Sequence, residues 1–232
     1  MQKYVKCLFS LVGLLLSQHA FAENWQGIYI GADIAYVKAD DIGKEYDLDG
    51  TYNSWKQDIK PEGIGLGLHV GNNTIVNDRF LFGVEANYKI YDVKDTAFQY
   101  KVTDGHLCDD NGAECTFKSK LDQSASILAR VGYLINEKTL IYAVGGYSAA
   151  RLERKLYDGW DQLKWMSYKK WQNGWTAGAG LEYMLLNSVG VKAEYRHTDL
   201  GAYSYYTPAY GGQYEKQKYH QNEISLGLNY HF

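Results

Sequence analysis

Apolar residues occupy every second position in eight stretches of the chain after Trp25. This period of two is typical of β-strands, because successive side chains of a strand point to opposite faces. The stretch at 174–185 would extend about 40 Å, and a tilt of about 40° leaves roughly 30 Å, the thickness of a bilayer core. The eight stretches lie at residues 28–36, 64–70, 80–90, 127–135, 140–144, 175–185, 189–195 and 224–232.

The opposite face of these strands is rich in glycine and in charged residues. Glycine weakens a strand and marks close approach of backbones, so it is not expected to be frequent on the solvent-exposed face of a soluble β-sandwich. A narrow barrel with its apolar face towards lipid accounts for both faces, since small residues and paired charges suit a crowded lumen. A gated ion path is the functional alternative to a structural charge network. The predicted lumen charges are Asp33, Glu85, Lys89, Arg130, Glu182, Lys192, Glu194, Arg196 and Glu223.

The connections between the stretches alternate between long and short. Outer-membrane barrels have long extracellular loops and short periplasmic turns, so both termini are expected on the periplasmic side. We predict an all-β, eight-stranded antiparallel transmembrane β-barrel that is monomeric, with four long extracellular loops. The long connections are 38–60, 92–120, 153–172 and 201–218, and the short ones are 72–79, 136–139 and 187–190.

Aromatic residues mark both ends of the apolar face, as interfacial anchoring requires. The sequence predicts a periplasmic ring of Trp25, Phe80, Tyr142, Tyr183, Tyr230 and Phe232. It predicts an outer ring of Tyr36, Tyr88, Trp175 and Tyr195.

The first 22 residues read as a signal peptide. Lys3 and Lys6 form a positive segment, residues 7–16 an apolar one, and Ala20 to Ala22 an A-x-A cleavage site. Cleavage after Ala22 leaves residues 23–232 as the barrel domain.

The cysteines of that domain, Cys108 and Cys115, are expected to form a local disulfide in an oxidising compartment. Zinc would need two more ligands, and only His106 is near.

Several functional classes receive little support from the residues. With 27 acids against 24 bases, the chain is no polycationic nucleic-acid binder. The histidines are scattered over both faces and the loops, and no serine nucleophile stands beside an acid–base pair, so we predict no enzyme. No metal site and no bound cofactor are expected.

The third long connection carries the densest cluster of basic and aromatic residues. It is expected either to pack on neighbouring loops or to contact anionic groups such as lipopolysaccharide phosphates or host glycans, helped by cation–π pairs. The predicted ligand-binding residues are Arg154, Lys155, Trp160, Lys164, Trp165, Lys169, Lys170 and Trp171.

Several segments resemble the small outer-membrane β-barrel proteins of Gram-negative bacteria. They are WQGIYIGA at 25–32, ILARVGY at 127–133, GWTAGAGLEY at 174–183 and VKAEYRHTDLG at 191–201. The alphaproteobacterial major surface antigens, which include hemin-binding proteins, are the most similar subgroup. The segment ISLGLNYHF at 224–232 resembles the signal read by the barrel-assembly machinery, which assigns an assembly role to Phe232.

The resemblance implies hemin as a further bound ligand. Axial ligation of its iron would fall to histidine or tyrosine. The loop candidates are His106, Tyr205, Tyr206, Tyr210 and His220.

We therefore predict an integral protein of the outer membrane that acts as a structural surface protein or antigen. Its loops would contact host surface molecules, lipopolysaccharide or hemin. A small porin-like channel is the alternative function, and an outer-membrane enzyme is a weaker one.

Overall fold

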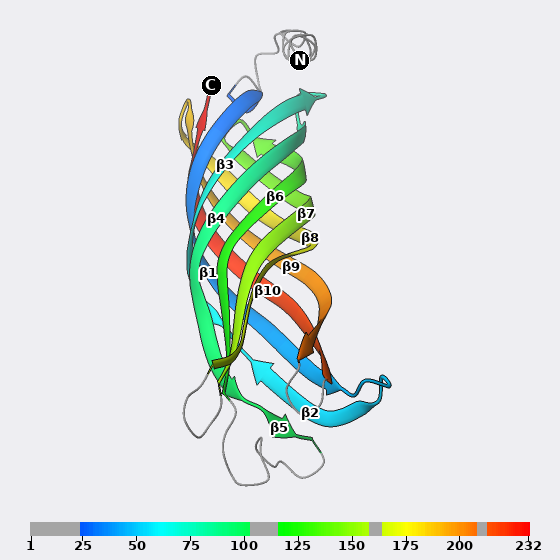
Figure 1. The fold of residues 1–232 in the computed structure, drawn as a ribbon. Coiled ribbons are helices and arrows are strands. Elements are labelled where there is room, and N and C mark those ends of the chain that lie inside the picture. Colours follow the sequence, from blue (N-terminus) through cyan, green and yellow to red (C-terminus); the bar gives the residue numbers. More distant parts are fainter. Residues whose placement is uncertain (1–23, 103–115, 158–163, 208–212) are drawn as a thin grey trace, which may run out of the picture.

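The computed structural model describes residues 24–102, 116–157, 164–207 and 213–232. These residues form strands joined by short connections, and none of the described segments is a helix that could cross a membrane (Figure 1). The strands are β1 (Gly27–Tyr46), β2 (Tyr52–Ile59), β3 (Glu62–Val76), β4 (Phe80–Phe98), β5 (Tyr100–Lys101), β6 (Thr116–Asn136), β7 (Thr139–Tyr157), β8 (Lys164–Leu186), β9 (Val189–Thr207) and β10 (Gln213–His231).

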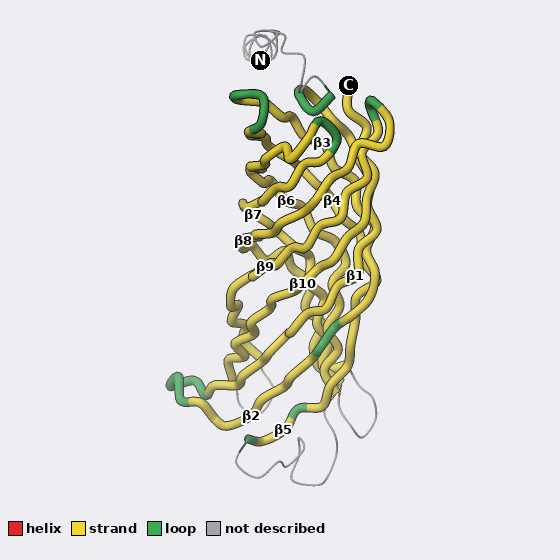
Figure 2. The backbone as a smooth tube through the Cα atoms, turned by 180° about the vertical axis from the view of Figure 1, so that it is seen from behind, coloured by secondary structure: helices red, strands yellow, loops and turns green. Residues whose placement is uncertain are grey.

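Eight of these ten strands close into a ring. Each strand pairs antiparallel with its neighbour in the order β1, β3, β4, β6, β7, β8, β9 and β10, and β10 pairs with β1 to complete the circle. The short strands β2 and β5 continue the sheet from the far end of β1. Figure 2 shows the wall from behind as a tube of tilted strands. The predicted eight-stranded antiparallel barrel is confirmed.

The two faces of the wall are the inverse of those of a soluble protein. Outward side chains such as Leu68 and Ile127 are 69% and 67% exposed, whereas inward Glu85 and Arg130 are buried. A continuous apolar outer face of this size requires lipid around it, because water would make its exposure costly.

The tight connections, the start of β1 and the end of β10 lie at one end of the barrel (Figure 1). The first connection turns at Asn77 and Asp78, which adopt positive φ angles of 51° and 58°. Asn and Asp tolerate this left-handed conformation better than most residues. The Phe232 N–H donates to the Ile28 carbonyl at 3.0 Å, which ties the last residue to the first strand.

The predicted long loops are mostly strand. β1 continues to Tyr46, and the third connection shrinks to the few residues between Tyr157 and Lys164. Beyond the membrane the outward face becomes polar, while apolar side chains such as Val93, Leu121 and Leu152 face inward. The outward apolar row that marks the membrane span therefore ends there, although backbone pairing continues. The barrel therefore extends well outside the outer aromatic ring.

The extended wall divides between β8 and β9. Their pairing ends at Trp175 and Asp199, while β8 continues against β7 and β9 against β10. Gly201, with a φ of 69°, lies where β9 leaves its neighbour, a conformation that glycine adopts readily.

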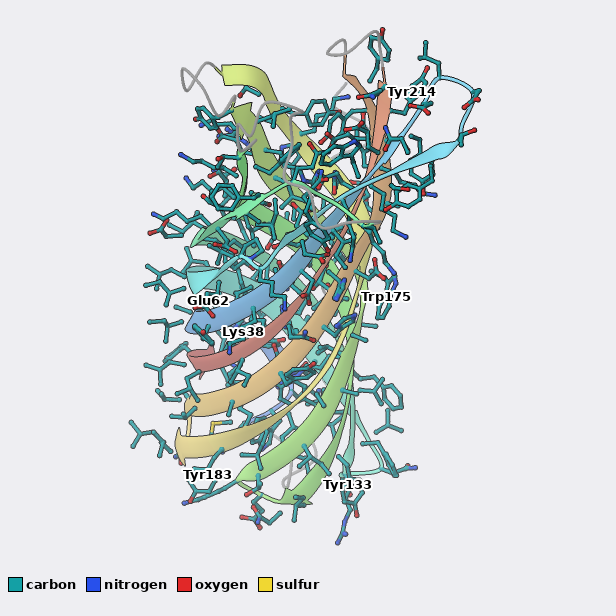
Figure 3. The ribbon with its side chains drawn as sticks, turned by 90° about the horizontal axis from the view of Figure 1, so that it is seen from below. Lys38, Glu62, Tyr133, Trp175, Tyr183 and Tyr214 are labelled. Atoms are coloured by element: carbon teal, nitrogen blue, oxygen red, sulfur yellow. The ribbon has the colours of Figure 1, made fainter. Side chains whose placement is uncertain are left out.

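The outer ring of aromatic residues is present. Tyr36, Tyr88, Trp175 and Tyr195 are each about half exposed on the outer face, and Tyr147 joins them from β7. Figure 3 shows Tyr133 and Tyr183 at one end of the barrel and Tyr214 at the other.

Two residues assigned to the periplasmic ring point inward instead. Trp25 and Tyr142 are buried, and the whole outward set predicted for 140–144 faces the lumen. Ile141 is the exposed neighbour. The prediction was wrong here because an apolar plug closes the periplasmic end, which makes both faces of β7 apolar. The plug consists of Trp25, Leu81, Leu128, Leu134, Leu140, Tyr142, Val144 and Met184.

Deleting Phe232 should lower the amount of folded protein in the outer membrane. Its side chain is 71% exposed at the end of the outward row of β10, where it contacts Tyr230 edge to face but fills no core. The measurement is heat-modifiable gel mobility of outer-membrane fractions. Replacing Phe80, another exposed rim aromatic, by leucine is the control and should leave the level unchanged. Normal levels after deletion of Phe232 would contradict the assembly role.

Candidate functional site

The nine predicted lumen charges lie inside one barrel and fall into three groups. The first group is nearest the apolar plug. Arg130 donates to Glu182 at 2.5 Å, and the other oxygen of Glu182 accepts from Asn229 at 2.7 Å and contacts His231 at 2.9 Å. The Arg130 guanidinium lies 3.8 Å from the ring centre of Tyr142, within the range of a cation–π interaction.

The second group is centred on Lys89. Its ammonium lies 2.5 Å from Asp33 and 2.6 Å from Glu223. Asp33 also faces the His69 ring at 3.3 Å, and the Tyr91 hydroxyl donates to Glu223 at 3.2 Å. A cation between two carboxylates satisfies charges that the narrow interior would otherwise leave unpaired.

The third group surrounds Glu85. Arg196 reaches Glu85 at 2.7 Å and also pairs with Glu194. Lys192 lies 3.8 Å from Glu85, and the Tyr29 hydroxyl donates to it at 2.9 Å. Arg196 thus links two acids contributed by different strands.

Five uncharged or histidine side chains between these groups also face the lumen, and they were not predicted from the sequence as lumen residues. They are His69, Tyr29, Tyr91, Asn229 and His231, which share the inward parity of the charged residues. Their position in the strand alternation, on the same face as the charged residues, could have predicted that they point inward. Their partners lie on distant strands, and strand parity alone does not reveal such partners.

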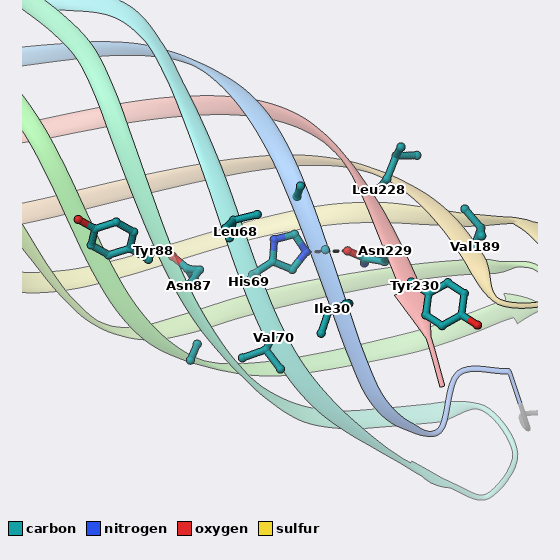
Figure 4. A pocket seen from close by; sticks show the side chains of 13 residues that line it. Ile30, Leu68, His69, Val70, Asn87, Tyr88, Val189, Leu228, Asn229 and Tyr230 are labelled. Atoms are coloured by element: carbon teal, nitrogen blue, oxygen red, sulfur yellow. Dashed lines mark hydrogen bonds between the residues drawn. The ribbon is translucent and has the colours of Figure 1, made fainter.

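Close approach across the lumen depends on glycine at one clear position. The Nε2 atom of His69 and the Oδ1 atom of Asn229 lie 2.6 Å apart in front of Gly31, and a Cβ added to Gly31 would collide with both (Figure 4). The side chains of Leu68, Val70 and Leu228 point to the other side of the wall. The groove that these three side chains line therefore belongs to the lipid-facing surface.

The lumen leaves little free space between its charged groups. A cavity of about 20 Å³ lies beside Lys89 and Arg196, enough for roughly one water molecule. Ser148, Thr176 and Thr198 form a chain of hydroxyl contacts of 2.6 and 2.7 Å along its wall. Within the described ranges, no three or more His, Cys, Asp or Glu side chains are arranged to hold a metal ion.

Arg154 was predicted to bind a ligand at the surface, but it lies in the extracellular part of the lumen. It is buried and makes two hydrogen bonds to Asp41, at 2.7 and 2.9 Å. Ser119 donates to the same carboxylate. Because the connection is a strand, Leu152, Arg154 and Leu156 all face inward. The assignment of Arg154 to an exposed binding loop was therefore wrong.

The other residues predicted in the third connection do not form one cluster. Lys155 and Lys169 face outward and both contact Glu153, at 2.5 and 3.3 Å. Lys170 instead donates to the Tyr203 hydroxyl at 2.8 Å across the division between β8 and β9. Trp171 is exposed. Lys164 and Trp165 belong to β8, where only their backbone is described, and Trp160 lies outside the described residues.

The hemin candidates within the described residues point in different directions. Tyr205 is buried in the lumen, whereas its neighbour Tyr206 is exposed and packs edge to face on Tyr214. His220 is half-buried and lies 3.1 Å from Asp40. His106, Tyr210, Cys108 and Cys115 lie outside the described residues, as does the predicted signal peptide at 1–22.

Two carboxyl groups face each other near the extracellular mouth. Glu45 and Glu215 are opposite one another in the pairing of β1 and β10, and both are buried. Glu215 accepts hydrogen bonds from Gln57 at 2.8 Å, Tyr205 at 2.6 Å and Gln217 at 3.2 Å. Burial, reinforced by the Glu45 carboxylate, outweighs these donors and raises the pKa of Glu215 to about 7.

The described residues define a class of protein. A closed antiparallel ring with an apolar outer face, an aromatic rim and a charged lumen is the architecture of an outer-membrane β-barrel. Residues 8–232 match the outer membrane protein β-barrel domain, and the chain belongs to that family.

The chain is similar to outer-membrane proteins of Brucella and Rhizobium. The chain is 26% identical to a 31 kDa outer-membrane immunogenic protein of Brucella melitensis, over 90% of this chain and 84% of the relative. It is 27% identical to a 25 kDa outer-membrane immunogenic protein of Brucella abortus, over 93% and 81% of the two chains. A 22 kDa outer membrane protein of Rhizobium leguminosarum is 25% identical, over 91% and 80%.

The fold is also found among solved structures. The outer membrane protein OprG of Pseudomonas aeruginosa superposes with a TM-score of 0.60 at 16% identity, covering 89% of this chain and 97% of that one. The family match and these relatives place the protein in the outer membrane, and the solved structure has the same fold.

Replacing Arg130 by leucine should destabilise the barrel by about 3–5 kcal/mol, because Glu182 would remain as a buried charge without its cation. Urea unfolding of the refolded protein measures this change. The double replacement of Arg130 and Glu182 by leucine is the matched comparison and should recover much of the loss. A cost below about 1 kcal/mol for the single change would contradict the assigned pairing.

The raised pKa of Glu215 makes part of the stability pH-dependent. The folded state binds this proton more tightly than the unfolded state, whose carboxyl has a pKa of 4.5, so this contribution is lost as pH rises towards 7. Glu215→Gln mimics the protonated form. The unfolding free energy of the native chain, relative to this variant, should fall by up to about 3 kcal/mol between pH 4.5 and pH 8.

The same urea titrations at both pH values provide the measurement. Glu62→Gln, at an exposed carboxyl of the extracellular wall, is the control and should show a much smaller change. A pH-independent difference between the native chain and Glu215→Gln would contradict the raised pKa.

Proposed function

We propose that the protein is a closed, non-enzymatic surface barrel whose extracellular wall and loops contact external ligands. The observation that carries this proposal is the contrast between the two parts of the tube. The membrane-spanning lumen is filled by paired charges and sealed by an apolar plug. The strands nevertheless continue beyond the outer aromatic ring and display charged and aromatic side chains outside the cell.

The relatives support the surface role. Two Brucella relatives are described as immunogenic, which fits a protein whose extracellular part is accessible to a host. The candidate ligands are host surface molecules, lipopolysaccharide and hemin. Among the described hemin candidates, Tyr205 and Tyr206 face opposite sides of the wall, which favours the anionic ligands over ligation of an iron by these residues.

A small channel is the second candidate function. The Ser148, Thr176 and Thr198 hydroxyls beside the lumen cavity provide a polar path for part of its length. To become continuous, that path requires disruption of the pairs of Lys89 and Arg130 and displacement of the apolar plug.

Planar-bilayer recording of the refolded barrel should therefore show no sustained conductance. An open porin recorded under the same conditions is the positive control. Replacing Leu128 and Leu140 of the plug together by alanine should produce at most brief openings, because the ion pairs above them remain. A stable open state of the native protein would contradict the closed-barrel proposal and favour the channel.

A further inference from the structure

Four lysines lie in two like-charged pairs on the outer surface of the extracellular wall. Lys94 of β4 is directly opposite Lys120 of β6, and Lys118 of β6 is directly opposite Lys155 of β7. Directly opposed like charges destabilise an antiparallel sheet. Barrel formation does not require these charges, because uncharged polar residues would keep the same face in water. We call these four residues the lysine patch.

The carboxylates around the lysine patch compensate only part of its charge. Lys94 contacts Asp92 at 3.0 Å, Lys120 contacts Asp122 at 2.8 Å, and Lys155 contacts Glu153 at 2.5 Å. Arg151 and Lys169 share Asp122, at 3.9 and 2.5 Å. Glu62 lies opposite Lys94 on β3, and Asp95 lines the same part of the wall. Six basic residues therefore stand beside five acids, which leaves a net charge of +1.

The other three lysines of the patch contact carboxylates, whereas Lys118 contacts an aromatic ring. Its ammonium lies 4.6 Å from the ring centre of Tyr157. The aromatic ring is uncharged, so this contact does not neutralise the lysine.

All four lysines line one groove with a volume of about 410 Å³. Its other lining residues are Asp95, Thr96, Ser119, Glu153 and Tyr157. This volume is within the range of small-molecule sites, roughly 300–1,000 Å³. The groove can accommodate a saccharide, with the lysines placed to contact attached phosphates.

The height of the patch identifies the source of the phosphates. Tyr88 and Tyr147 mark the outer membrane rim on β4 and β7. Arg151 lies four residues beyond Tyr147 and Lys155 eight residues beyond it. At about 3.3 Å per residue and a tilt of about 40°, the basic surface begins roughly 10 Å above the rim and ends roughly 20 Å above it. The headgroup layer of a phospholipid bilayer is only about 5–8 Å thick on each side, so this height is above phospholipid phosphates and is reached by the longer saccharide of a glycolipid.

We infer that the lysine patch binds phosphate groups on the saccharide headgroup of an outer-leaflet glycolipid, the lipopolysaccharide around the barrel. This inference deepens the proposed surface function and rests on its placement of the extended wall outside the cell. Phosphates between Lys94 and Lys120 and between Lys118 and Lys155 offset the repulsion within each pair. Occupation therefore stabilises the folded barrel, since a ligand that binds only the folded state raises its stability.

The test compares the native barrel with the quadruple variant Lys94→Gln, Lys118→Gln, Lys120→Gln and Lys155→Gln. Both are refolded into phosphatidylcholine vesicles and titrated with rough lipopolysaccharide. We expect the variant to lose about tenfold or more in affinity and most of its salt dependence. Its Tm without lipopolysaccharide should equal or exceed that of the native barrel, because the like-charge pairs are gone.

Two further variants separate charge from position. Changing the four patch lysines to arginine should retain binding, because the positive charges remain. The second variant removes the same number of charges elsewhere, at Lys38, Lys60, Lys138 and Lys218, and should bind within about twofold of the native barrel. A fall in the Tm of the glutamine variant, with binding intact, would make the lysines purely structural and overturn the inference.

Two probes identify the ligand. Chemically dephosphorylated lipopolysaccharide should bind as weakly to the native barrel as intact lipopolysaccharide does to the glutamine variant. Equal binding of the two lipopolysaccharides overturns the phosphate assignment. Binding of soluble inositol hexakisphosphate as tight as that of lipopolysaccharide assigns the patch to a soluble polyanion and overturns the glycolipid.

Conductance is recorded from the same preparations, so that failure of the lipopolysaccharide inference can be distinguished from failure of the closed-barrel proposal. A closed barrel that binds lipopolysaccharide equally well with and without the patch lysines overturns the inference alone. A conducting barrel that binds through the patch overturns the closed-barrel proposal alone.

Discussion

The pairing of β10 with β1 is the interaction on which the rest of the structure depends. In hydrocarbon, no water satisfies the backbone groups of an open edge, so the sheet must close on itself. The register runs unbroken from Tyr29 opposite His231 to Tyr46 opposite Tyr214, along the whole length of the wall. A ring of eight strands then leaves an interior that side chains can fill. Every residue that faces inward must therefore pack against, or pair with, other side chains.

The narrow interior explains why the charges of the lumen are paired. A lone charge in the interior would be costly, and each of Arg130, Lys89 and Arg196 is held against one or two carboxylates from other strands. The apolar plug around Leu140 removes the need for charges at the periplasmic end. The same closure that satisfies the backbone in lipid thus leaves an interior filled by side chains, which supports the proposal that the protein acts through its outer surface.

Outside the membrane the constraint relaxes, because water can satisfy any backbone group that is left unpaired. The wall divides between β8 and β9 there, and buried acids such as Glu215 are held by neutral donors. Opposed lysines such as Lys94 and Lys120 are also tolerated on this part of the wall. Departures from the most stable arrangement are expected where a surface is shaped for a ligand.

The sequence by itself determined the class of fold, the number of strands in the ring and the inward set that includes Glu85 and Arg196. It could do so because a period of two needs no knowledge of neighbours. It misassigned Tyr142, since both faces of β7 are apolar beside the plug, and it placed Arg154 in an exposed loop because its partner Asp41 is distant in the chain. The register between neighbouring strands and the meeting of side chains across the lumen, and therefore which charges pair, were decided only by the tertiary structure. The pairing of Lys118 with Lys155 belongs to that second kind of information, because strand register joins residues that no local pattern connects.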